Sequence, residues 1–102
     1  MARRHPVDKS DLERWRTMSA AVVLAALSDY AKKDQDYRPV RDSASTRWHV
    51  TAHGAEFEIV CTGAKFFDTR GGIGGGGAVD LAIHLFGVNF KQAIVMMRSK
   101  GL

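Results

Sequence analysis

Cysteine is nearly absent from this chain, since Cys61 is the only one in 102 residues. A single thiol excludes an internal disulfide, and it excludes every zinc site that needs two or more thiolates. No metal and no cofactor is therefore expected to bind. A lone thiol is also typical of a reduced protein, so the expected compartment is the cytoplasm.

Long apolar runs are missing as well. No stretch approaches the roughly 18 apolar residues that a membrane-spanning helix needs, so no membrane partner is expected. The basic residues at 1–6 have no apolar segment behind them, which argues against a signal peptide. Residues 1–8 are expected to form a flexible basic arm, followed by a single domain over residues 9–102.

The composition is that of a folded protein with a basic surface. Hydrophobic residues make up 45% of the chain and charged residues 25%, which is typical of a globular domain and not of a disordered one. The formal net charge is +4. This excess favours a polyanionic partner, with nucleic acid ahead of a membrane surface.

Two helices are predicted in the N-terminal part. Ser10 and Glu13 have the form of a capping box for a short helix that ends near Thr17. Ser19 can cap a second helix, whose apolar positions give it a broad buried face before it frays near Tyr30. The polar segment that follows is expected to hold one short extended stretch at residues 37–40.

The middle of the chain changes to the period of a β-sheet. Residues 47–52 and 56–61 alternate apolar and polar side chains, with His53 and Gly54 as a hairpin turn between them. A third strand is predicted at residues 65–68, and residues 71–77 read as a glycine-rich loop. The pattern predicts an antiparallel meander.

Two further helices are predicted after the glycine-rich loop. Residues 78–86 have the apolar positions of a buried helix, and Gly87 is placed to end it. Asn89, with Gln92 three residues later, can cap the last helix. The expected fold is α+β: an antiparallel sheet of three to five strands with N-terminal helices and two C-terminal helices.

One stretch carries a recognisable order of motifs. An aromatic strand end at residues 66–68 leads into the glycine loop, then Gly-Ala-Val-Asp-Leu at 77–81 opens a helix, and Gly-Val-Asn-Phe at 87–90 opens another. This order resembles the C-terminal half of the zinc-binding domain of bacterial and plasmid DNA primases. The glycine-rich variant is most similar to primase-like domains of plasmids, conjugative elements and phages.

The resemblance stops at the metal. The positions of the family's Cys-x-x-Cys pair hold Thr69 and Gly72, and no cysteine lies in residues 43–49, where the first pair belongs. The alternation of its strand points Cys61 to the core. The chain thus resembles a zinc-less relative of the family, with a zinc-ribbon-like fold held by apolar contacts.

Aromatic and basic residues of the predicted strands form the candidate nucleic-acid site. Aromatic faces stack on bases and cations neutralise the backbone when a protein binds a single strand. Phe66 and Phe67 must point to opposite sides, so one of them is available for stacking. The alternative is that the aromatics are core and the cations merely solvated. The candidate residues are Arg47, Trp48, Lys65, Phe67 and Arg70.

The glycine run and the histidines have structural alternatives. Gly74, Gly75, Gly76 and Gly77 either contact phosphate through their amides or serve tight packing at a strand-to-helix corner. Asp80 is expected to favour the helix dipole or to form a local cap, not to act in catalysis. His84 is expected to be a packed or surface histidine, not a ligand. No catalytic residue is assigned, since no nucleophile–base pair is evident.

These observations support two functions of different class. The resemblance implies a non-catalytic nucleic-acid-binding module that takes single-stranded DNA in the replication or transfer of a mobile element. Its partner is expected to be a primase with a Toprim core, or another replication or transfer protein. The alternative is an adaptor or inhibitor that uses the degenerate primase-type fold as a scaffold. Either reading fits a stand-alone protein or an excised N-terminal domain.

Overall fold

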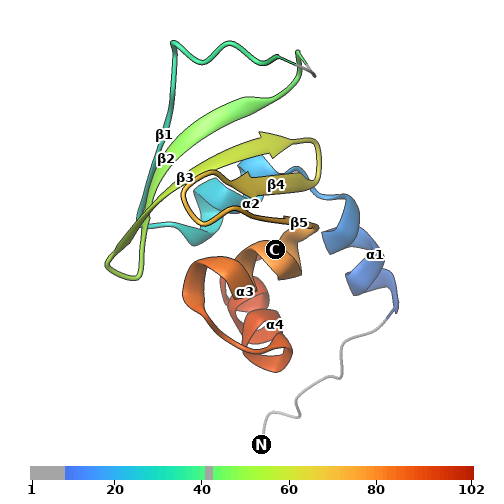
Figure 1. Cartoon of the computed structure of the whole chain (residues 1–102). Coiled ribbons are helices and arrows are strands. Elements are labelled where there is room, and N and C mark those ends of the chain that lie inside the picture. The colour runs from blue at the N-terminus through green and yellow to red at the C-terminus, as the bar shows by residue number, and fades with distance from the viewer. Residues whose placement is uncertain (1–8, 41–42) are drawn as a thin grey trace, which may run out of the picture.

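Along the described part of the chain, two helices come first, five strands follow, and two helices come last (Figure 1). The computed structural model describes residues 9–40 and 43–102. The predicted N-terminal arm lies outside the described residues. In chain order the elements are α1 (Lys9–Thr17), α2 (Ala20–Leu27), β1 (Tyr30–Lys33), β2 (Thr46–Ala52), β3 (Ala55–Thr62), β4 (Lys65–Asp68), β5 (Ile73–Gly76), α3 (Ala78–Phe86) and α4 (Phe90–Ser99).

The strands form one antiparallel sheet in the order β1-β2-β3-β4-β5, so every strand pairs with its neighbour along the chain. Its centre is the long β2–β3 hairpin. His53 and Gly54 both have positive φ, 53° and 75°, which is the backbone of a tight hairpin turn. The α+β class and the predicted meander are confirmed.

The helices cover one face of this sheet. Helices α2 and α3 lie against this face (Figure 1). The buried strand residues all belong to the parity that points toward it: Val50, Ala52, Ile59, Cys61, Phe66 and Asp68. The largest fully buried side chains come from both layers: Trp15, Val23, Leu24, Ile59, Leu81 and Met97. Phe66 is buried at 5% exposure and Cys61 at 2%, as the alternation predicts.

The caps of the C-terminal helices are those that the sequence predicts. Gly87 adopts the left-handed conformation after α3, with φ 64°, and its amide donates to the Ile83 carbonyl. Asn89 caps α4 in a complete capping box, because its side chain accepts from the Gln92 amide and the Gln92 side chain accepts from the Asn89 amide.

The capping box predicted at Ser10 is wrong. The helix already begins at Lys9, so Ser10 lies inside α1. In a helix that begins there, the Glu13 amide belongs to the main-chain hydrogen-bond ladder and is not left for a side-chain cap.

The edge strands also differ from the prediction. The second helix ends at Leu27, and β1 forms at Tyr30–Lys33 instead of residues 37–40, because the Asp29 amide donates to the Thr51 carbonyl and ties the chain to β2. Part of the predicted glycine loop is a strand, since β5 at Ile73–Gly76 pairs with β4. Both edges take their conformation from a neighbouring strand.

Two contacts tie distant segments together. The Ala20 amide at the start of α2 donates to the Gly63 carbonyl in the β3–β4 turn, at 2.8 Å. The Arg14 guanidinium on α1 donates to the Leu102 carbonyl at 3.1 Å. Of the helices in residues 9–40 and 43–102, none is by itself long and apolar enough to cross a membrane.

Candidate nucleic-acid interface

No helix of the described residues covers the sheet face opposite α2 and α3. Every side chain of this parity in β1 to β5 keeps at least partial exposure. We call this surface the open face. Its residues are Tyr30, Lys32, Arg47, His49, Thr51, Glu56, Glu58, Val60, Thr62, Lys65, Phe67, Gly74 and Gly76.

A row of side chains crosses the middle of the open face. The strand register pairs Arg47 with Val60, Val60 with Phe67, and Phe67 with Gly74. Phe67 is 46% exposed. Gly74 leaves room for this ring, because a Cβ at Gly74 would lie 3.2 Å from the Phe67 Cδ1 atom. The row therefore presents an aromatic ring, an aliphatic side chain and a guanidinium side by side.

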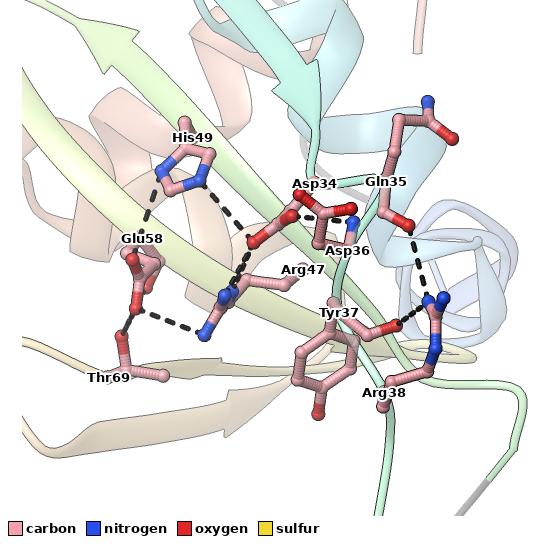
Figure 2. Close-up of polar contacts among 9 residues, drawn as sticks. All are labelled: Asp34, Gln35, Asp36, Tyr37, Arg38, Arg47, His49, Glu58 and Thr69. Atoms are coloured by element: carbon pink, nitrogen blue, oxygen red, sulfur yellow. Dashed lines mark hydrogen bonds and ion pairs between the residues drawn. The ribbon is translucent and has the colours of Figure 1, made fainter.

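Arg47 is fixed in place by carboxylates and an aromatic ring (Figure 2). Its Nε donates to Asp34 Oδ2 at 2.9 Å, and its guanidinium lies 5.1 Å from the centre of the Tyr37 ring. Its Nη1 lies 3.9 Å from Glu58 Oε1. The hydrogen bond from Arg47 lowers the pKa of Asp34, and the same bond raises the pKa of Arg47. The charge of Arg47 is thus compensated, and its guanidinium lies over the Tyr37 ring at the end of the row.

A polar network lies beside this row (Figure 2). His49 lies between two carboxylates, with Nε2 3.7 Å from Asp34 Oδ2 and Nδ1 3.8 Å from Glu58 Oε2. The Thr69 hydroxyl donates to Glu58 Oε1 at 2.7 Å. These contacts fix the carboxylates that surround Arg47.

Three of the predicted residues lie near one another at β4. Lys65 and Phe67 are two residues apart on the open face, and Arg70 is exposed in the turn that follows β4. Neither Lys65 nor Arg70 forms an ion pair with any residue in the described ranges 9–40 and 43–102. Their charges are therefore available to a ligand beside the Phe67 ring.

Trp48 lies on the other face of the sheet. It is half-buried against the core, and its Nε1 donates to the Thr46 hydroxyl at 2.9 Å. Adjacent residues of a strand point to opposite sides, so Arg47 and Trp48 do not share a surface. The open face instead gains Val60 and Tyr37. Alternation within β3 could have predicted that Val60 points to this face. Tyr37 lies in an irregular segment, where no period predicts the direction of a side chain.

The glycine run packs tightly against aromatic rings. A Cβ at Gly75 would lie 2.8 Å from the Phe66 Cε1 atom, so only glycine fits without a shift of that ring. Gly77 has φ 97° at the entry to α3. The Gly76 amide donates to Asp80 Oδ2 at 3.4 Å, so a carboxylate already faces the amides at this helix end, as expected of Asp80. The geometry matches the packing interpretation at Gly74 and Gly75, whereas a Cβ at Gly76 would meet open space.

A buried acid–base pair joins the β4–β5 turn to α3. Asp68, 5% exposed, accepts from the Arg70 and Gly71 amides at 2.9 Å, and its Oδ2 lies 2.6 Å from His84 Nε2. Burial alone raises the pKa of Asp68, but the hydrogen bonds from Gly71, His84 and Arg70 outweigh it and hold the pKa below its usual range. His84 is a packed histidine, as predicted.

Thr69 and Gly72, which stand where the resemblance would place a zinc pair, form main-chain hydrogen bonds. The Thr69 amide donates to the Glu58 carbonyl, and the Gly72 amide donates to the Asp68 carbonyl at 2.8 Å. No group of three or more histidine, cysteine or acidic residues suited to a metal occurs in the described part of the chain. Burial raises the pKa of the Cys61 thiol to about 12, so it is held as a protonated core residue.

Comparison of the chain with protein-family models, with curated proteins and with solved structures finds no match. The function of the open face is therefore inferred from its own chemistry.

Proposed function

We propose that the chain is a nucleic-acid-binding module that holds single-stranded DNA on the open face. The observation that carries this proposal is the cross-strand row, in which Phe67, Val60 and Arg47 lie side by side with Tyr37 beneath the guanidinium. Bases of a single strand stack on exposed aromatic rings whatever their sequence. Lys65 and Arg70 lie beside the Phe67 end of the row, where they meet the backbone phosphates.

The charge of the open face sets the strength of this binding. Asp34 and Glu58 offset Arg47, and Glu56 adds a further negative charge. Stacking must then contribute more than ion pairing. The open face and the turn after β4 have three cations without an ion pair to any described residue: Lys32, Lys65 and Arg70. Each contact of a cation with a phosphate of a single strand contributes about −0.7 to the slope of log affinity against log salt concentration, so the expected slope is about −2.

The resemblance to the primase zinc-binding domain supports the same assignment. The module is then a zinc-less accessory domain of the cytoplasm, not catalytic by itself. It presents a single strand to a primase-type or transfer protein of a mobile element.

The test is fluorescence anisotropy with a labelled oligo-dT. We expect Phe67→Ala to weaken binding at least tenfold, because stacking on one aromatic is worth about 1–3 kcal/mol per base. Phe90→Ala is the matched control, since Phe90 on α4 has the same 46% exposure and does not belong to the cross-strand row. The double reversal Lys65→Glu with Arg70→Glu should weaken binding further and flatten the salt slope.

Two results would overturn the proposal. One is an absence of binding at low salt. The other is an equal loss in the Phe67 and Phe90 variants, which would mean that the oligonucleotide does not use the open face.

A second candidate function, docking to another protein, is favoured by a separate surface on α4. It does not compete with the first, because α4 packs on α3 and takes no part in the open face.

A further inference from the structure

Helix α4 has apolar side chains that its packing on the core leaves partly exposed. Its inward residues are buried, among them Ala93 and Met97. A shallow groove on the outward side is lined by Val88, Lys91, Gln92, Val95 and Met96. Its apolar side chains are Val95 and Met96 on the helix and Val88, which precedes the helix and packs partly against the core. The four lining residues of α4 fall at i, i+1, i+4 and i+5 counted from Lys91, which places them on one face of the helix. Val95 is 47% exposed.

The charge around this groove has one sign. No aspartate or glutamate follows Asp80 in the sequence, whereas Lys91, Arg98 and Lys100 do. Arg98 is 3.6 Å from Asp11 of α1. Lys91 and Lys100 form no ion pair with residues 9–40 or 43–102. An apolar stripe with cations on its borders is complementary to an apolar stripe with anions on its borders.

We propose that this groove binds an acidic amphipathic helix of another protein. The partner's apolar residues pack between Val88, Val95 and Met96, and its carboxylates lie near Lys91 and Lys100. Helix-in-groove recognition of this kind reads apolar anchors at helical spacing, and the surrounding charges select the partner.

A second copy of this chain does not supply such a helix. Among the four helices, α2 and α4 have no acidic residue and α3 has Asp80 alone. The acids of α1, Asp11 and Glu13, are outnumbered by its basic residues. A lipid surface fits less well than a helix, because Gln92 interrupts the apolar stripe and the surface is hollowed.

The test uses a synthetic helix of leucine at i, i+3, i+4 and i+7 with glutamate elsewhere, added to the ¹⁵N-labelled chain. We expect amide shifts confined to residues 88–100. Val95→Glu should weaken the affinity at least tenfold, while Val22→Glu, at an exposed valine of α2, should leave it unchanged. Neither variant should alter binding of oligo-dT, so this proposal and the proposed function fail separately.

Control probes decide between occupants. A peptide of the same composition in scrambled order, or one with lysine for glutamate, should not bind. Equal binding of either peptide, or amide shifts outside residues 88–100, would overturn the proposal. Failure of the acidic helix to bind would also overturn it. In that case, vesicle binding or dimer formation that Val95→Glu abolishes would assign the groove to a lipid surface or to a second copy; the probes are anionic phosphatidylglycerol vesicles and sedimentation velocity.

Discussion

At the scale of single residues, the glycines before α3 are not equivalent. Gly77 has φ 97°, a conformation that strains any L side chain, and a Cβ there would lie 3.4 Å from the Arg16 Cα. Gly76, one residue earlier, has open space around the position of a Cβ. We expect Gly77→Ala to lower the free energy of unfolding by about 2 kcal/mol. Gly76→Ala should change it by less than about 0.5 kcal/mol.

Urea unfolding followed by circular dichroism measures both glycine variants. Equal destabilisation by the two would contradict this account, because it would mean that the whole run, and not the conformation of Gly77, limits stability.

The sequence predicts the side of the sheet on which a residue lies when the alternation within its own strand determines that side. Alternation alone assigns Cys61 to the core and puts Phe66 and Phe67 on opposite sides, and the structure shows that Phe66 is the buried one. The same rule separates Trp48 from Arg47, which the candidate set had placed together. The pairing of Asp68 with His84 had no signal, because the two residues lie 16 positions apart and on different elements.

At the scale of elements, the Asp68–His84 pair holds the β4–β5 turn against α3. Folding lowers the pKa of Asp68 below its ordinary value of 3.8, so the ionised carboxylate stabilises the fold at pH values above 3.8. This contribution is lost as the pH falls through the folded-state pKa. Asp68→Asn keeps an acceptor for the turn amides but loses the charge, and should cost about 2 kcal/mol at pH 7.

The check on this pair is chemical unfolding at pH 7 and again in acid, below the ordinary pKa of aspartate. The difference in stability between the natural chain and Asp68→Asn should shrink in acid. Asp36→Asn, at an exposed carboxyl in the β1–β2 segment, is the control and should differ little at either pH. A difference that stays constant with pH would refute the role of the charge.

The elements that the sequence predicts are those whose own residues carry a period, a turn or a cap. The β2–β3 hairpin has its period and its turn, and α3 and α4 have their caps. The edge strands have neither. β1 forms on β2, and β5 forms on β4 despite its glycines, so pairing between segments overrides local preference.

At the scale of the whole molecule, we expect the fold to hold without a metal. A buried core is formed by both layers, and the hydrogen bonds of Asp68 hold the β4–β5 turn, where the proposed relationship to the primase domain would place a zinc pair. We expect treatment with EDTA to leave the Tm unchanged in a thermal scan. A fall in Tm, with stoichiometric zinc in elemental analysis of the untreated protein, would contradict the proposed zinc-less relationship.

The whole molecule also separates two surfaces. The open face offers aromatic and basic groups to a single strand, while the α4 groove offers an apolar stripe to a helix. The sequence indicates the first through its strand residues. The second depends on which side of α4 packs on α3, and periodicity alone leaves that choice open.

The neighbour-to-neighbour order of the strands has a consequence for how the chain folds. From β2 to β5 each strand reaches its partner after a short turn, and only β1 is joined by a longer segment, residues 34–45, so most of the sheet assembles with little entropy lost in closing loops. Such a topology has a low contact order for a β-rich fold, and chains of this kind fold quickly. The slowest contacts to form are then the long-range ones, such as the bond from Arg14 to Leu102 across 88 positions.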